Sequence, residues 1–365
     1  MPNADAYLHD AFAAFELGAP VAGTKRFGQG HINDTYLVET QASRRFIFQR
    51  ISPVAFKRPD QLMENVVGIT EYLSRELEKT GGDARRGTLR FLRTREGGYY
   101  YTDPDGGAWR AYPFVEGTVC YETAETPELF AASGRAFGRF QRLLQGYPAQ
   151  TLYETIPRFH DTEDRLAKLK AAAEADPLGR KAGCQAEISF ILAREADCSV
   201  ALQALREGRL PLRVTHNDTK LNNVLMDEKT GEGVCIVDLD TVMPGLSIND
   251  FGDSIRFGAN HCAEDERDLS KVSLDLQLFA LYTQAFLEGA GGTLTDEEIA
   301  YLPWGAKLMT LECGMRFLTD HLEGDVYFHT SRAGQNLDRC RTQFKLVADM
   351  EAHWDEMKSI VEKYR

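Results

Sequence analysis

The sequence predicts an α+β protein with two lobes, a small β-rich N-terminal lobe and a larger, mainly helical C-terminal lobe. Two observations support this prediction. Short β-branched and aromatic runs separated by turns dominate the first hundred or so residues, whereas apolar residues recur at helical intervals from Pro127 onward. The chain has 365 residues, of which 43% are hydrophobic, and this is enough for two packed lobes. We place the boundary between residues 1–114 and 115–365.

Within the first lobe, the runs at 35–38 and 46–48 predict two strands joined by a polar turn. Residues 59–79 predict a helix, because a proline opens the segment, apolar residues follow at helical spacing and two glycines end it. An Asp-Gly-Gly turn at 105–107 separates two further strand-like runs. These two strands are expected at 99–101 and 109–114, and a further strand is expected at 89–92.

The second lobe is helical in pattern except for one compact segment. Residues 160–210 and 270–365 predict amphipathic helices. Between them, short apolar runs flank a polar loop and a turn, and predict strands at 212–215, 224–226 and 235–237. A polar loop held between apolar strands is a suitable place for chemistry, because the strands can fix its position.

Charge and composition exclude several classes of protein. The formal net charge of −13 argues against nucleic acid as the main partner, since a phosphate backbone requires a basic surface. No apolar stretch approaches the length of a membrane span, and the N-terminus lacks the pattern of a secretory signal. The seven cysteines are scattered and form no CxxC pair. We therefore expect a monomeric cytoplasmic protein with reduced thiols and no membrane partner.

The polar loop carries the strongest motif, H-x-D-x-K-x-x-N at 216–223, and Asp238 ends an apolar strand 20 residues after Asp218. Phosphoryl transfer requires a carboxylate that orients the attacking hydroxyl, oxygen ligands for Mg²⁺ and a cation for the transferred group. On this interpretation Asp218 is the base and Lys220 the cation, while Asn223 and Asp238 bind Mg²⁺. The alternative is a solvated polar turn, which the occurrence of both halves of the motif between apolar strands disfavours.

A glycine-rich turn at 27–36 enters the first predicted strand. Gly28, Gly30 and Asn33 are candidates for a flap over the phosphates of ATP, because glycines let backbone amides approach them closely. The alternative is an ordinary hairpin turn. The chain has no P-loop motif, and no helix directly follows the glycines, which disfavours a dinucleotide site. Val115, at the hinge between the lobes, is a further candidate for nucleotide binding.

These motifs, together with D-F-G-D-S-I-R at 250–256, resemble the aminoglycoside phosphotransferase and choline kinase superfamily. More closely, nearly the whole chain resembles bacterial N-acetylhexosamine 1-kinases. The resemblance implies a two-lobed protein-kinase-like fold and Mg²⁺-dependent transfer from ATP to the anomeric hydroxyl of GlcNAc or GalNAc. The sugar contacts that it implies are His31, Asp218, Phe257, Arg316 and Tyr327.

Some of these positions have a second interpretation. The wider superfamily carries a lysine where this chain has Gln49, and strand alternation directs the adjacent Arg50 to the opposite face. Arg316 and Asp320 lie four residues apart on a predicted helix, so an intrahelical ion pair is an alternative to a sugar contact. Tyr327 is equally compatible with simple packing.

Two other functions stay open at this point. A kinase of amino alcohols, homoserine-like metabolites or aminoglycosides would use the same motif, but a cationic acceptor favours a pocket lined by carboxylates. A nucleotide-binding protein without turnover is disfavoured, because a degraded kinase is expected to lose at least one residue of the motif.

Overall fold

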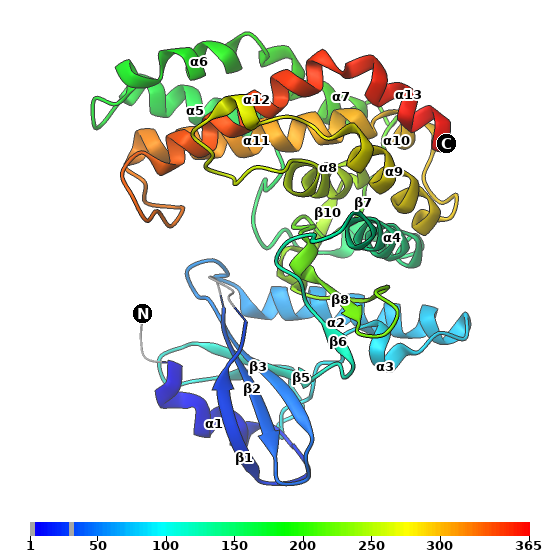
Figure 1. Ribbon diagram of the computed structural model, residues 1–365. Helices are drawn as coiled ribbons and strands as arrows, with labels where there is room; N and C mark the ends of the chain where they lie inside the picture. The colour runs from blue at the N-terminus through cyan, green and yellow to red at the C-terminus, as the bar shows by residue number, and fades with distance from the viewer. Residues whose placement is uncertain (1–3, 29–32) are drawn as a thin grey trace.

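A computed structural model describes residues 4–28 and 33–365 (Figure 1). The N-terminal lobe is built on a five-stranded antiparallel sheet with the order β1-β2-β3-β5-β4. Its strands are β1 (Val21–Arg26), β2 (Asp34–Thr40), β3 (Arg45–Ile51), β4 (Tyr101–Thr102) and β5 (Ala108–Pro113).

Different elements cover the two faces of this sheet. Phe46 and Phe48 of β3 point to the outer face, where α1 (Leu8–Ala14) covers them. Ile47 points to the inner face, where it joins the core formed with α2 (Pro59–Lys79). This alternation gives the sheet an apolar outer layer and leaves its inner face toward the second lobe.

The connection between the lobes runs through residues 114–117 to β6 (Thr118–Val119). β6 pairs with β8 (Val224–Asp227), and β8 pairs with β9 (Gly233–Ile236), so the connection is hydrogen-bonded to the second lobe. Because the last residue of the five-stranded sheet is Pro113, we propose that the lobe boundary lies between residues 114 and 115.

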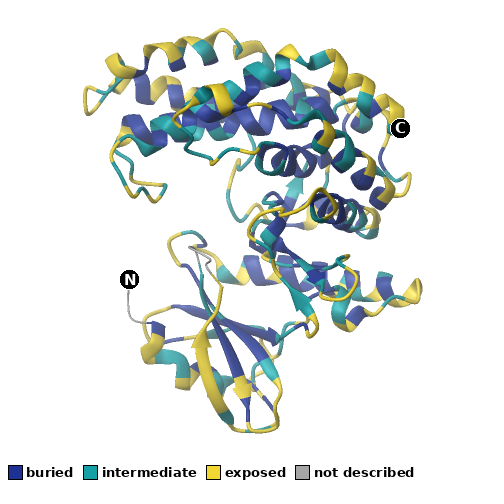
Figure 2. Cartoon of the chain, viewed as in Figure 1, coloured by how far each residue is buried: buried dark blue, intermediate teal, exposed yellow. Residues whose placement is uncertain are grey.

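The second lobe is helical, and its central helix is α11 (Leu302–Glu323), which is buried along most of its length (Figure 2). The other helices are α3 (Ala84–Gly87, beside α2), α4 (Pro127–Leu143), α5 (Thr162–Ala175), α6 (Gln185–Leu192), α7 (Val200–Arg206), α8 (Ser247–Gly258), α9 (Leu276–Ala290), α10 (Asp296–Ala300), α12 (Gln335–Ala352) and α13 (Trp354–Tyr364). A two-stranded ribbon of β7 (Arg213–Thr215) and β10 (Met243–Gly245) lies under α8. Within residues 4–28 and 33–365, no helix has the length and apolar character needed to cross a membrane.

The predicted mixed fold with a small sheet lobe and a helical lobe is confirmed, and the predicted helix at 59–79 has the bounds of α2. The strand predicted at 89–92 is wrong. This segment contributes one backbone bond to β5, from the amide of Leu92 to the carbonyl of Ala111, and the edge of β5 pairs instead with β4. β1 was not predicted, because its residues are mostly exposed and show no apolar alternation.

Helices α8 and α11 approach each other through glycines. A Cβ added to Gly252 would overlap the carbonyl group of Gly305, and a Cβ added to Gly305 would overlap that of Ile248. The two backbones are therefore in direct contact, without side chains between them. This contact fixes the position of α8, which carries the anchors of the active site described below.

We predict that Gly305→Ala destabilises the protein by about 1–3 kcal/mol, the usual effect of overpacking. The sign of this change in the free energy of unfolding is informative, because glycine to alanine in an unhindered helix would stabilise the protein by about 1 kcal/mol. Urea unfolding measures the difference. Gly183→Ala is the matched control, since a Cβ there meets no neighbouring atom. A Gly305→Ala variant as stable as the wild type would contradict this account of the packing.

Candidate active site

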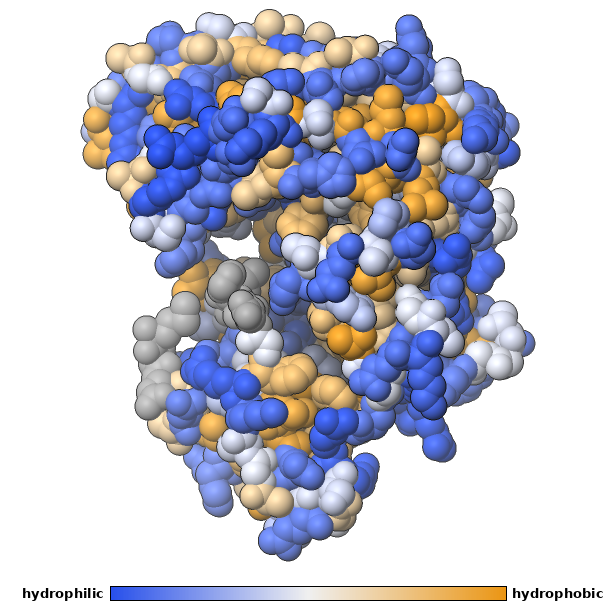
Figure 3. Space-filling model, viewed as in Figure 1, coloured by the Kyte–Doolittle hydropathy of each residue, from blue (hydrophilic) through white to orange (hydrophobic). Residues whose placement is uncertain are grey.

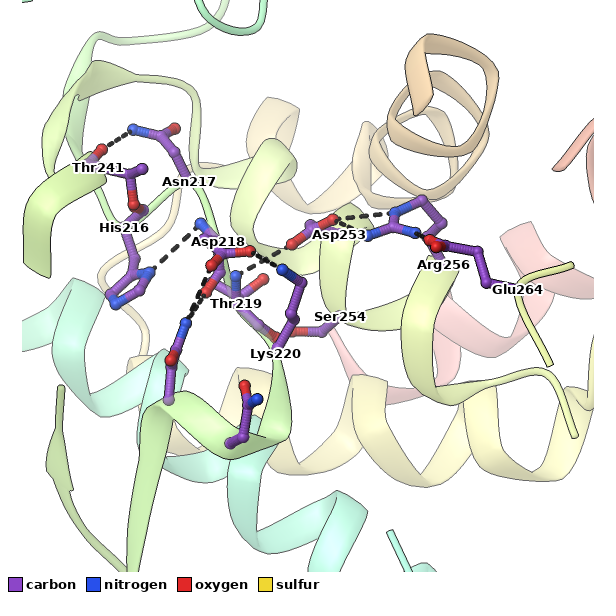
Figure 4. Close-up of polar contacts among 12 residues, drawn as sticks. His216, Asn217, Asp218, Thr219, Lys220, Thr241, Asp253, Ser254, Arg256 and Glu264 are labelled. Carbon is purple, nitrogen blue, oxygen red and sulfur yellow. Dashed lines mark hydrogen bonds and ion pairs between the residues drawn. The ribbon is translucent and has the colours of Figure 1, made fainter. Parts of the chain in front are cut away.

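The polar loop at 216–223 connects β7 to β8 and begins with a strained turn (Figure 4). Asn217 has a φ of +66°, a left-handed conformation that asparagine tolerates better than most residues. Its side-chain nitrogen donates to the carbonyl of Thr241 at 2.8 Å, and its side-chain oxygen accepts from the hydroxyl of Thr215 at 2.8 Å. These two bonds hold the turn, after which Asp218 no longer follows the direction of β7.

Two carboxylates of α8 fix the backbone of this loop. Asp250 is fully buried and accepts from the amides of His216 at 3.0 Å and Asn217 at 2.8 Å. Asp253 accepts from the amide of Thr219 at 3.1 Å. Asp250 and Asp253 lie three residues apart and therefore on one face of the helix, so α8 orients consecutive amides on both sides of Asp218.

His216 connects the loop to the strand that ends at Asp238. Its buried ring lies with Nε2 2.9 Å from the carbonyl oxygen of Val237, to which it donates, and Nδ1 accepts from the amide of Asp218 at 3.3 Å. This is the neutral imidazole with its proton on Nε2. His216 therefore holds the loop against the strand that ends at Asp238.

The side chains of the motif meet one another around Asp218 (Figure 4). The ammonium of Lys220 lies 2.8 Å from the carboxylate of Asp218. The side-chain amide of Asn223 donates to the carbonyl oxygen of Asp218 at 2.8 Å and to its carboxylate at 3.2 Å. Within the described residues, the amide oxygen of Asn223 receives no hydrogen bond, so this oxygen stays available to a cation.

Asp238 has a backbone φ of +56°, and although part of its side chain reaches solvent, the surrounding protein encloses its carboxylate. Burial by the surrounding protein, with the carboxylates of Asp240 and Asp218, raises the pKa of Asp238 to about 6. Such an accumulation of negative charge favours binding of a cation. Mg²⁺ in kinases is typically held by one or two protein oxygens together with substrate phosphates, and Asn223 and Asp238 fit that requirement.

The nucleotide candidates of the first lobe are only partly described. Gly30 and His31 lie outside the described residues, so their predicted roles stay predictions. Gly28 has a φ of +76°, which favours glycine. Asn33 is placed by two side-chain bonds: its amide nitrogen donates across the lobes to Asp240 at 2.6 Å, and its oxygen accepts from the amide of Ser52 in the same lobe at 2.9 Å.

Val115 is buried in the connection between the lobes, and its carbonyl oxygen accepts from the hydroxyl of Thr118 at 2.8 Å. The space-filling view shows a hollow between the two lobes (Figure 3). The connection that contains Val115 joins the lobes, so its backbone is a suitable wall for a nucleotide base.

Gln49 lies opposite Arg110 on the inner face of the sheet. Its amide oxygen accepts from the Nε of Arg110, its neighbour across β3 and β5, at 3.0 Å. Arg110 also donates to Asp240 at 2.5 Å, and both of these side chains are buried. Arg50 points to the opposite face, as predicted from strand alternation, and pairs there with Asp103 at 2.7 Å.

Arg316 lies on α11 among aromatic rings. Its guanidinium carbon is 5.4 Å from the ring centre of Phe159, 5.8 Å from that of Tyr327 and 5.3 Å from that of Phe328. These distances are within the range of cation–π contacts. Tyr327 packs edge-on against Phe328, with 4.8 Å between the ring centres, but it is 68% exposed, so a molecule in solution reaches this group of side chains.

The alternative ion pair between Arg316 and Asp320 is wrong. Asp320 is buried and accepts instead from the amides of Val326 at 2.9 Å, Tyr327 at 2.8 Å and Phe328 at 3.0 Å. A loop with three amides to satisfy competes better for a buried carboxylate than a single neighbouring guanidinium. Asp320 therefore positions the loop that brings Tyr327 to Arg316.

His160 connects the Arg316 group to the catalytic loop. Its Nδ1 lies 3.0 Å from the buried carboxylate of Glu312, one helical turn before Arg316, and its Nε2 lies 3.2 Å from the carbonyl oxygen of Asn217. Burial alone would lower the pKa of His160, but the charge and hydrogen bond of Glu312 outweigh it and raise that pKa. Because both ring nitrogens face acceptors, the imidazolium form satisfies both contacts. Phe257 is half-buried near the end of α8.

Comparison with known proteins agrees with this arrangement. The family model described as "Phosphotransferase enzyme family" matches residues 23–280. The chain belongs to this family. The match includes most of the sheet, the catalytic loop and α8, and it ends before α11, which carries Arg316.

Solved structures of other phosphotransferases share the fold at low sequence identity. An aminoglycoside phosphotransferase from Alicyclobacillus acidocaldarius is 13% identical, with a TM-score of 0.59 over 97% of this chain and 96% of that one. An amicoumacin kinase is 15% identical, with a TM-score of 0.60 over 94% and 93%. The ethanolamine kinase of Plasmodium vivax is 13% identical, with a TM-score of 0.53 over 88% and 82%.

Sequence reasoning missed several residues that build the site of this phosphotransferase. The roles of Asp250 and Asp253 as loop anchors were signalled only by their spacing of three on a helix. His160 and Glu312 are 152 residues apart in the chain, and no local pattern relates them. Arg110 was not selected, although it faces Gln49 across the sheet.

We predict that His160→Gln costs more stability at pH 6 than at pH 9. The folded-state pKa of His160 is raised above its unfolded value near 6.5, so the pair with Glu312 stabilises fully below that unfolded value. This contribution is lost as the pH rises through the folded-state pKa. Urea unfolding of wild type and variant at both pH values measures it. In a Glu312→Gln background the pH dependence should largely disappear, and an equal cost of His160→Gln at both pH values in the wild-type background would contradict the assignment.

Proposed function

We propose that this phosphotransferase is a Mg²⁺·ATP-dependent kinase of the anomeric hydroxyl of GlcNAc or GalNAc, and that it acts as a cytoplasmic monomer. One observation carries the proposal. Asp218 bonds to Asn223 and acts electrostatically on Asp238, the two candidate metal ligands, while His160 connects the same loop to Glu312, one helical turn before Arg316. This arrangement is the one that a donor, a hydroxyl and an acceptor require.

Asp218 orients the acceptor hydroxyl and accepts its proton as the new oxygen–phosphorus bond forms and the bond to the leaving ADP breaks. When bound, Mg²⁺·ATP supplies the phosphoryl group and neutralises part of its charge. Lys220 is placed to attract the transferred group, since its ammonium already lies beside Asp218. Asn223 holds Asp218 from the other side and so limits its rotation.

The charge of the acceptor side favours a neutral sugar over a cationic acceptor. Arg316, Arg165 and His160 contribute positive charge there, and Glu312, which is 3.0 Å from His160 and 3.9 Å from Arg165, is the carboxylate among them. Asp253 is neutralised by its pair with Arg256 at 2.9 Å. A cationic acceptor such as an aminoglycoside or an amino alcohol would be repelled by the positive charge there, and a neutral sugar would not. Aromatic rings commonly stack on sugar rings, and Tyr327 offers such a ring.

The names of the similar structures support a nucleotide and a divalent cation. The amicoumacin kinase was solved with AMP-PNP and Ca²⁺, and another similar structure is a spectinomycin phosphotransferase with ADP. These relatives act on varied small acceptors, so the choice of a sugar for this chain depends on its own pocket.

We predict that Asp218→Asn lowers turnover by about 10²-fold to 10⁴-fold, the usual contribution of a general base, while the affinity for Mg²⁺·ATP stays within a few-fold. Steady-state kinetics and calorimetric titration with AMP-PNP measure the two quantities. Asn222→Ala is the matched control, because Asn222 lies on the same loop but bonds to Glu122. Substantial turnover by Asp218→Asn would remove the central role of this residue.

We predict that the products are the 1-phosphates of GlcNAc and GalNAc, and that the 1-O-methyl glycosides are not substrates. Phosphorus NMR identifies the product, because an anomeric phosphate couples to H1. Arg316→Ala should raise the KM for the sugar by about 10-fold to 100-fold, the value of one charged hydrogen bond, and change the KM for ATP little. A 6-phosphate product, or turnover of aminoglycosides in place of sugars, would refute the proposed acceptor.

A further inference from the structure

The inner face of the sheet carries one buried cation, within the described residues. Arg110 and Arg50 are the arginines of the sheet with almost no exposed surface, and Arg50 points to the outer face, where it pairs with Asp103. Gln49 occupies the neighbouring inner-face position on β3 but has no charge. Arg45 and Lys25 share this face but are more exposed, and Arg45 pairs with Glu116, so Arg110 is the buried positive charge of this face.

The guanidinium of Arg110 is held at the junction of the two lobes. Its Nε donates to Gln49 at 3.0 Å and its Nη1 donates to Asp240 at 2.5 Å. Gln49 is itself oriented by Thr35, to whose hydroxyl its amide nitrogen donates at 3.2 Å. The position of the guanidinium is thus fixed from two adjacent strands and from the loop that follows Asp238.

The two bonds leave part of the guanidinium unused. Within the described residues, they occupy two of its five N–H groups. Burial opposes the charge of Arg110, but Asp240 and Asp238 outweigh burial and raise its pKa. Asp238 is the candidate metal ligand, so Arg110 lies on the phosphate side of the site and not on the acceptor side.

We propose that Arg110 is the residue through which the sheet lobe binds the phosphates of the nucleotide, with Gln49 and Asp240 as its positioning residues. The inference rests on the proposed use of ATP but not on the identity of the acceptor. It assigns to β5 a charge that Gln49 cannot supply from β3. Two N–H groups of one guanidinium also suit phosphate oxygens, which accept paired donors well.

The test is a calorimetric titration of the full chain with adenosine, ADP and ATP, with Mg²⁺ and without acceptor. In Arg110→Gln, the dissociation constant of ATP should rise by about 10-fold to 100-fold and that of ADP should also rise, whereas that of adenosine should stay unchanged. Gln49→Lys in the Arg110→Gln background returns a cation to the inner face from β3 and should recover part of the loss. Arg90→Gln, at an exposed position, is the matched control.

A second variant separates this role from a merely structural ion pair. Arg110→Gln combined with Asp240→Asn removes both buried charges, so neither is left without its partner. If Arg110 only compensates Asp240, the double variant should bind ATP as the wild type does, and this result would overturn the proposal. Equal weakening of adenosine and ATP, or unchanged ATP binding in Arg110→Gln, would also overturn it. A wild type that binds ATP but phosphorylates another acceptor would refute only the proposed sugar, and one that binds no ATP would refute both proposals.

Discussion

The rest of the active site depends on one interaction. The carboxylate of Asp250 accepts hydrogen bonds from two consecutive backbone amides. The amides of His216 and Asn217 are held by this carboxylate where Asn217 adopts a left-handed conformation, which costs a non-glycine residue roughly 1–2 kcal/mol. A buried carboxylate with two amide donors offsets that cost. Without this bond the turn would relax toward the strand, and Asp218 would leave the position in which it meets Lys220 and Asn223.

Charge is divided between the two sides of Asp218. On the metal side, Asp218, Asp238 and Asp240 lie close enough for their carboxylates to raise the pKa of Asp238. Arg110 balances only part of this negative charge, which leaves the site suited to a divalent cation. On the proposed acceptor side, Arg165 and Arg316 share the single carboxylate of Glu312. One catalytic carboxylate therefore separates two surroundings of opposite charge.

Local patterns in the sequence predicted the parts of the structure that local forces determine. The helix at 59–79 was predictable because a proline, an apolar stripe and a glycine stop all act within one segment. The catalytic loop was predictable because its chemistry requires certain residues at a fixed spacing. Non-local competition decided the remainder. Asp320 bonds to a loop beyond its helix instead of to Arg316, and the segment 89–92 meets a strand edge that another segment already occupies. Such outcomes depend on which partners the fold brings together, and spacing along the chain does not record them.

The glycine contact between α8 and α11 separates two properties of the enzyme, the choice of acceptor and the geometry of phosphoryl transfer. α8 holds the loop that carries Asp218 through Asp250, while α11 and the loop tied to Asp320 carry Arg316 and Tyr327, the proposed contacts of the acceptor. Since Gly252 and Gly305 join these helices by backbone alone, side chains that point from α11 into the pocket take no part in the joint. New acceptor preferences can therefore arise by divergence on α11 and its loop while the distance between hydroxyl and phosphate is inherited unchanged. Laboratory evolution of this scaffold toward other sugars has the same freedom, provided that both glycines are retained.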